Sequence, residues 1–177
     1  DRHLGFIVDY WYRNVVFDLL TCCSDYDKEI FHHIFPKAKR IEKTNLPRNK
    51  ELEMGNEGVA IKIQHELGIK HDKKIILYAP TFRDYATDEL SQPAVEMLNE
   101  LSKEYTVLVR EHYFSKLSFP DNVINVSNYP YVNELMIVSD LLITDYSSIL
   151  FDYALLKKPI YLFLYDWKEY AQYRGFY

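Results

Sequence analysis

The sequence has 177 residues and a formal charge of −5, with 48% hydrophobic and 27% charged residues. These proportions exclude a disordered or low-complexity chain and allow one domain, or one domain with a piece of another. The acidic balance argues against a general nucleic-acid binder, which carries a basic face. No apolar run approaches the roughly 18 residues of a membrane-spanning helix, so we expect a soluble domain. The adjacent Cys22 and Cys23 cannot form an ordinary disulfide with each other, and we expect reduced core thiols in a cytoplasmic protein.

The first part of the chain shows short β-rich runs on either side of one helix. Val15–Cys23 is typical of a buried strand, and Lys39–Lys43 of a weaker one. Ser24 can cap the intervening helix, and Pro36 ends it. Leu46-Pro47-Arg48-Asn49 then breaks regular structure, because proline restricts the residue before it. We therefore place a domain boundary here and expect domains at residues 1–45 and 46–177.

The remainder of the chain alternates strands with segments of helical length. Strands are predicted at Lys74–Tyr78, Thr106–Val109, Val123–Val126, Leu141–Thr144 and Ile160–Leu164. Helices are predicted at about Glu57–Leu67, Gln92–Lys103, Tyr131–Val138 and Ser147–Leu156, with a last helical turn or two at Trp167–Tyr173. Strands that alternate with helices of this length require parallel crossovers. The sequence therefore predicts an α/β fold with a doubly wound parallel sheet.

Three of the predicted strands end in motifs rich in polar side chains. The chain reads Ala79-Pro80-Thr81-Phe82-Arg83-Asp84 after the first, Arg110-Glu111-His112 after the second, and Thr144-Asp145-Tyr146-Ser147-Ser148 after the third. In open α/β sheets, ligands bind outside the carboxyl ends of the strands. The motifs would bring two arginines, a histidine and several hydroxyls to one edge. This gathering indicates an anionic ligand.

The third motif is typical of a phosphate site. Ser147 and Ser148 lie where a strand passes into a helix, so hydroxyls and unpaired N–H groups point the same way. Asp152, one helical turn beyond Ser148, could accept hydrogen bonds from a sugar hydroxyl of a nucleotide. The alternative is that Asp145, Ser147 and Ser148 only cap the helix.

The second motif carries the charges that a diphosphate needs. Arg110 and His112 face the same side of an extended segment, and together they can neutralise a diphosphate and stabilise it as it leaves. The alternative is that Arg110 pairs with a surface carboxylate and His112 is a loop residue. Arg83 is a weaker candidate, because it could pair with Asp84. Asp25-Tyr26-Asp27 fits a metal-binding pattern, but it begins a helix, where acidic residues are favoured.

These motifs, taken together, resemble the CDP-glycerol glycerophosphotransferases, the teichoic acid polymerases and primases. The resemblance rests on five segments over about residues 40–177: Leu46–Asn49, Ala79–Asp84, Arg110–His112, Ser139–Ser148 with Phe151–Tyr153, and Arg174–Tyr177. It departs from the family at Asn45, Leu46 and Lys50, where Gly, Tyr and Asp are usual, and at Tyr113, which is usually proline.

The resemblance implies a GT-B architecture, in which two Rossmann-like domains face each other across a cleft. This chain would be the C-terminal, donor-binding half, preceded by a remnant of the acceptor half. Carried over by motif, His112 and Arg110 would be catalytic, and the remaining donor-site residues would be Arg48, Pro80, Thr81, Glu111, Ser147, Ser148 and Asp152. The family needs no metal and no cofactor. Its His-Gly-Thr-Pro type motif, which supplies the base, does not occur in this sequence, so we expect this chain alone to be inactive.

The resemblance also implies a reaction. We expect transfer of glycerol phosphate, or ribitol phosphate, from a CDP-alditol donor to a hydroxyl of a teichoic-acid or capsule-type polymer, with release of CMP. The partners would be the donor and, through the missing half, a lipid-linked polymer, but no nucleic acid. The parent protein would be cytoplasmic and peripheral on the inner face of the membrane. Two alternatives stay open, a GT-B glycosyltransferase that uses a UDP- or GDP-sugar and a non-catalytic nucleotide-binding fragment.

Overall fold

The computed structural model describes residues 10–44, 46–54, 57–70, 72–83, 91–111 and 118–174. The chain divides into two compact units, Asp1–Lys50 and Glu51–Tyr177. The predicted domain boundary falls a few residues earlier, between residues 45 and 46.

The first unit contains a small parallel strand pair with one helix. Strand β1 (Leu20–Cys22) pairs with β2 (Ile41–Lys43), and α2 (Asp25–Ile34) connects them. Ser24 caps α2 as predicted, since its Oγ accepts the N–H of Asp27 at 3.0 Å. Asp25 forms an ion pair with Lys43 at 2.7 Å, in keeping with a structural role for this acidic pair.

Two predictions for this unit are wrong in part. The strand predicted at Val15–Cys23 is only three residues long, because a two-stranded pair offers few partners for a longer strand. Cys22 is buried, but Cys23 is exposed, because it follows the last residue of β1. The expectation of two core thiols therefore holds for Cys22 alone.

The predicted break at residues 46–49 is itself helical. A short 3-10 helix η1 (Pro47–Asn49) leads directly into α3 (Lys50–Met54). Pro47 occupies the first turn of η1. In this position the missing N–H of proline would have no partner within the helix, and its fixed φ suits helical geometry. The proline that indicated an interruption thus begins a helical segment.

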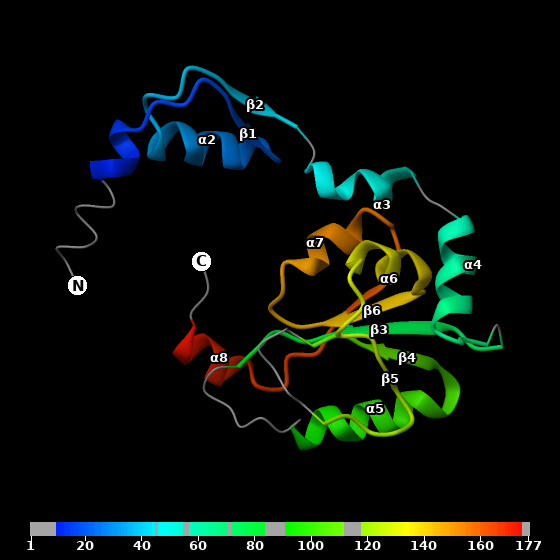
Figure 1. Cartoon of the computed structure of the whole chain (residues 1–177). Helices are drawn as coiled ribbons and strands as arrows, with labels where there is room; N and C mark the ends of the chain where they lie inside the picture. Colours follow the sequence, from blue (N-terminus) through cyan, green and yellow to red (C-terminus); the bar gives the residue numbers. More distant parts are fainter. Residues whose placement is uncertain are drawn as a thin grey trace. The chain divides into compact units, whose positions relative to one another are not determined.

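Within the described residues, the second unit has one parallel sheet of five strands (Figure 1). The strands are β3 (Ile75–Ala79), β4 (Thr106–Val109), β5 (Ile124–Asn125), β6 (Leu141–Thr144) and β7 (Ile160–Leu162), in the order β5-β4-β3-β6-β7. The helices are α4 (Glu57–Glu66), α5 (Gln92–Glu104), α6 (Val132–Val138), α7 (Ile149–Ala154) and α8 (Trp167–Tyr173). Figure 1 shows α5 on one face of the sheet and α6 and α7 on the other. The predicted doubly wound α/β fold is confirmed.

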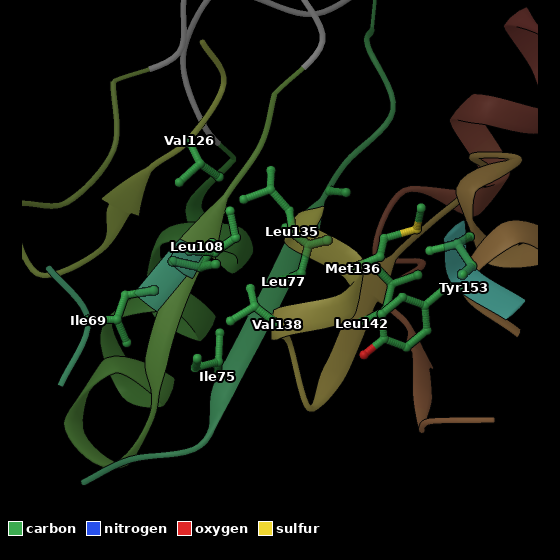
Figure 2. Close-up of a cluster of buried hydrophobic side chains, with 13 residues drawn as sticks. Ile69, Ile75, Leu77, Leu108, Val126, Leu135, Met136, Val138, Leu142 and Tyr153 are labelled. Atoms are coloured by element: carbon green, nitrogen blue, oxygen red, sulfur yellow. The ribbon is translucent and has the colours of Figure 1, made fainter. Parts of the chain in front are cut away.

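The two faces of the sheet bury two separate apolar clusters. In β3, Ile75 and Leu77 belong to the cluster beneath α4, α6 and α7, whereas Ile76 and Tyr78 belong to the cluster beneath α5. Figure 2 shows the first cluster, in which side chains of adjacent strands meet those of the helices, among them Tyr153. Consecutive strand residues point to opposite faces, so a strand covered on both sides must be apolar throughout. Because the apolar residues of each strand must be buried on both faces, each strand ends where its apolar run ends, and the polar motif begins there.

Candidate functional site

The three polar motifs begin side by side at one edge of the sheet, where their strands end in register. Tyr78 of β3 is in register with Val109 of β4, and Ala79 is in register with Thr144 of β6. The N–H of Arg110 donates to Tyr78 O at 2.9 Å, which continues this register into the second motif. With neighbouring strands about 4.8 Å apart, the first residues of the outer two motifs lie about 10 Å apart across β3.

This edge contains the point where the strand order reverses. From β3 the chain runs outward to β4 and β5, and it then returns to the other side of β3 with β6 and β7. Loops diverge at such a switch point and leave a crevice in which doubly wound proteins bind ligands. The motifs after β3 and β6 lie at this crevice, and the motif after β4 flanks it.

Arg110 is held by main-chain carbonyl groups. Its guanidinium donates to the carbonyl oxygens of Val126, at 3.3 Å, and of Tyr129. Within the part of the chain that the structure describes, no carboxylate pairs with it, so the predicted alternative of a surface ion pair is wrong there. Burial lowers the pKa of Arg110, although an arginine remains protonated at any physiological pH. Arg110 is therefore a half-buried, positioned cation that an anion could neutralise.

The loop that holds Arg110 is itself anchored. The single phenol O–H of Tyr129 is within donating distance of the carboxylates of Glu134 and, at 3.2 Å, of Glu66. Lys62 approaches the same two carboxylates at 3.8 and 3.6 Å. These contacts tie the loop before α6 to α4 and so help to fix the carbonyl that orients Arg110.

The turn between β6 and α7 presents two serine hydroxyls. Ser148 is exposed and, among the described residues, makes no side-chain cap to α7, while Ser147 Oγ accepts only a long bond of 3.4 Å from the N–H of Ile149. Capping alone therefore accounts poorly for this pair. Because α7 has only six residues, its dipole is short, and the local N–H and hydroxyl groups are the stronger anion-binding feature.

Thr81 is engaged within the protein. Its N–H donates to Asp145 Oδ1 at 2.9 Å, and its hydroxyl donates to the same oxygen at 2.5 Å. Asp145 is buried at 5% exposure and also accepts the N–H of Tyr146 at 2.7 Å. Thr81 can therefore offer a ligand its oxygen as an acceptor, while its proton stays with Asp145.

The other predicted site residues are distributed as follows. Pro80 is half-buried and follows β3 directly, and Asp152 is half-buried on α7. Glu111 follows Arg110, and its N–H donates to Ser127 Oγ at 3.0 Å. Arg48 is exposed in η1 and belongs to the first unit. His112 lies outside the described residues.

The structure gives a place to Arg83, the weaker candidate of the sequence, and adds Asp166, which sequence reasoning missed. Arg83 forms buried ion pairs with Asp145 at 2.6 Å and with Asp166 at 2.9 Å. The predicted pairing with the adjacent Asp84 lies outside the described residues. Asp166 carries no motif signal of its own, and it reaches Arg83 only because β7 ends beside β6.

A groove lies on the α5 face of the sheet and extends to the edge opposite the motifs. This apolar groove of about 590 Å³ is lined in part by Lys74, Asp140 and Pro159, which precede β3, β6 and β7. It contains none of the predicted site residues. Among the described residues there is no cluster of three or more metal-ligating side chains. Across the same residues, no helix has the length and apolar character needed to cross a bilayer.

Comparison with known proteins decides the family. The family model described as CDP-Glycerol:Poly(glycerophosphate) glycerophosphotransferase matches residues 7–177. The chain belongs to this family. It is 40% identical over 174 residues to a teichoic acid poly(glycerol phosphate) polymerase of Bacillus subtilis, and 36% identical over 167 residues to a teichoic acid glycerol-phosphate primase of the same organism.

Solved structures agree with this assignment. The structure of a histidine-to-alanine variant of the wall teichoic acid polymerase TagF matches 90% of this chain with a TM-score of 0.75 and 39% identity. A histidine-to-asparagine variant of TagF soaked with CDPG matches with a TM-score of 0.72. This glycerophosphotransferase-family chain spans 23% of the B. subtilis polymerase, 42% of the primase and 42% of the TagF chain.

Proposed function

We propose that the full-length protein transfers glycerol phosphate, or ribitol phosphate, from a CDP-alditol to a hydroxyl of a teichoic-acid or capsule-type polymer. Within it, this chain would bind the CDP-linked donor. The observation that carries the proposal is that three motifs leave the same edge of the sheet, two at its switch point and one beside it, with Arg110 in the latter lacking a carboxylate partner among the described residues. Relatives named for poly(glycerol phosphate) and poly(ribitol-phosphate) polymerisation support the choice of donor.

The proposed chemistry is one displacement at phosphorus. The acceptor hydroxyl oxygen attacks the β-phosphorus of the donor, which carries the alditol. The bond from this phosphorus to the bridging oxygen breaks, and CMP leaves with that electron pair. The hydroxyl proton passes to a base that none of the motifs in this sequence supplies. Little covalent work falls on the protein, so catalysis rests on positioning and charge stabilisation.

The predicted site residues have distinct proposed roles. Arg110, with His112 after it, would stabilise the charge that accumulates on the bridging oxygen and on CMP. The turn at Ser147 and Ser148 would hold the second phosphate through hydroxyl and N–H groups. Asp152, one turn into α7, would accept a hydrogen bond from a sugar hydroxyl. Pro80, Thr81 and Glu111 would complete the donor site.

No metal is required in this proposal. The donor diphosphate carries about two negative charges, and Arg110, together with hydrogen bonds from His112 and the serine turn, would stabilise them. The polymer acceptor would contact the remainder of the full-length protein, which would be peripheral on the inner face of the cell membrane.

Nucleotide discrimination tests the proposed donor. Calorimetric titration of the chain with CDP, UDP and GDP should give a clear preference for CDP, and the full-length protein should release CMP from CDP-glycerol only when a polymer acceptor is present. A preference for UDP or GDP would instead indicate a glycosyltransferase. Binding of CDP without CMP release by the full-length protein would indicate a non-catalytic nucleotide-binding module.

A further inference from the structure

Arg83 lies at the centre of a buried network at the crevice. Its Nε and Nη2 donate to the two carboxylate oxygens of Asp166 at 2.9 and 3.0 Å. Its Nη1 donates to Asp145 Oδ2 at 2.6 Å and to the carbonyl of Thr81. Four of the five N–H groups are thus used, and the side chains of Arg83, Asp145 and Asp166 are only 8%, 4% and 6% exposed. A guanidinium in this state has little capacity left for a ligand.

Aromatic rings enclose the same guanidinium. Its Cζ lies 5.4 Å from the ring centre of Tyr146, 5.6 Å from that of Tyr165 and 5.8 Å from that of Tyr170. Tyr146 stacks on Tyr170 at 3.7 Å, and its hydroxyl donates to Asp166 at 3.1 Å. The rings exclude water and favour a cation over their faces. The network is therefore largely shielded from solvent, and most of the N–H groups of Arg83 are already bonded within it.

The charge balance makes the network depend on arginine. Two buried carboxylates share one cation, and removing that cation would leave two desolvated negative charges close together. Burial disfavours the charge of Arg83, but the hydrogen bond to Asp166 and the charge of Asp145 outweigh it and raise its pKa. Lysine would keep the charge but lose the planar fork that bonds both oxygens of Asp166.

The network connects three separate loops of the carboxyl edge. Arg83 and Thr81 follow β3, Asp145 and Tyr146 follow β6, and Asp166 precedes α8. Asp145 accepts hydrogen bonds from Arg83, from the N–H and hydroxyl of Thr81 and from the N–H of Tyr146, so one carboxylate joins the loop after β3 to the loop after β6. Ser147, in the proposed phosphate turn, is only two residues beyond Asp145.

We propose that Arg83 is a positioning residue, which clamps the loops after β3, β6 and β7 and so sets the donor-binding geometry of Thr81 and the Ser147–Ser148 turn without touching the donor. This inference rests on the proposed function, since it concerns the same donor site. The Arg83–Asp145–Asp166 network would then contribute to the affinity for the donor as well as to the stability of the fold.

Two readouts on Arg83→Lys test the proposal in the 177-residue chain. Amide hydrogen exchange at Thr81 and Tyr146, whose N–H groups both bond to Asp145, should become at least tenfold faster. The dissociation constant of CDP should rise at least tenfold. Asp166→Asn, which keeps the side-chain shape but removes the charge, should change both quantities in the same direction.

A matched control separates positioning from general destabilisation. Leu98→Ala creates a cavity beneath α5, where Leu98 is fully buried and takes no part in the hydrogen bonds of the Arg83 network. At temperatures chosen so that both variants are equally far below their melting points, Leu98→Ala should leave the CDP dissociation constant and the two amides at wild-type values. Normal CDP affinity in Arg83→Lys, or an equal loss of affinity in Leu98→Ala, would overturn the proposal.

The outcomes also distinguish this inference from the proposed function. If the wild-type chain does not bind CDP, the proposed function fails, and unchanged exchange at Thr81 and Tyr146 in Arg83→Lys would separately refute the clamp. If Arg83→Lys does not fold, the same two readouts on Asp166→Asn decide the matter.

Discussion

Replacement of Arg110 by alanine separates ligand binding from folding at the candidate site. The guanidinium bonds only to the carbonyls of Val126 and Tyr129 among the described residues, and it is half-buried. Water can reach this half-buried site and replace part of these bonds, so the free energy of unfolding should fall by about 1–3 kcal/mol. The melting temperature should therefore fall by about 2–4 °C for each kcal/mol lost.

The effect on transfer should be much larger. A charge-assisted hydrogen bond contributes about 1.5–3 kcal/mol, and each 1.36 kcal/mol of barrier changes the rate tenfold. Loss of one such bond to the leaving phosphate corresponds to a turnover about 10- to 150-fold lower. The assay is CMP release from CDP-glycerol by the full-length protein with a polymer acceptor.

Arg40→Ala is the matched control for this experiment. Arg40 forms an exposed ion pair with Glu42 at 3.1 Å, in the other unit of the chain. Its removal should leave both turnover and melting temperature nearly unchanged, because exposed pairs contribute little. Wild-type turnover in Arg110→Ala, or a rate loss fully explained by unfolding, would refute the role assigned to Arg110.

Three further predictions concern metal, pH and packing. Excess EDTA should leave CMP release unchanged, whereas a loss restored by Mg²⁺ would contradict charge stabilisation by Arg110 and His112. Burial raises the pKa of Tyr153 to about 12, so the folded state keeps a phenol proton that the unfolded state loses above about pH 10. The free energy of unfolding should therefore fall as the pH rises from about 10 to about 12. Urea unfolding at a series of pH values should show this fall, and it should be less steep in Tyr153→Phe. Leu77→Ala, at a fully buried position of β3, should lower the free energy of unfolding by about 2–5 kcal/mol in the same assay. Ile61→Ala, at an exposed position of α4, should lower it only slightly.

Much of the fold is predictable because both faces of the sheet are buried. The apolar runs at Thr106–Val109 and Leu141–Thr144 have the predicted bounds in the structure. A run of this kind, followed by polar residues, marks both the strand and its carboxyl end, so the convergence of Arg110 and Ser147 on one edge follows from the sequence. The short helix α3 is not predictable from the same signal, because its single buried side chain, Leu52, shows no periodicity.

The contacts that fix the site are not predictable from local pattern. Arg83 and Asp166 are 83 residues apart, and only the placement of β7 beside β6 brings them together. Arg110 is oriented by carbonyl oxygens of a loop, and a main-chain carbonyl has no side-chain signature in a sequence. The sequence therefore indicates which residues reach the edge but not which of them are available to a ligand.

Chemical-shift mapping of CDP on the isotope-labelled chain tests most directly whether the carboxyl edge is the donor site. As CDP is added, the account predicts saturable shifts of the backbone amides at Thr81, Arg110, Ser147 and Ser148. Amides beside the apolar groove at the opposite edge, such as those of Lys74 and Asp140, should stay unchanged. Shifts confined to that groove, or no saturable shift at any of the four motif residues, would contradict the account.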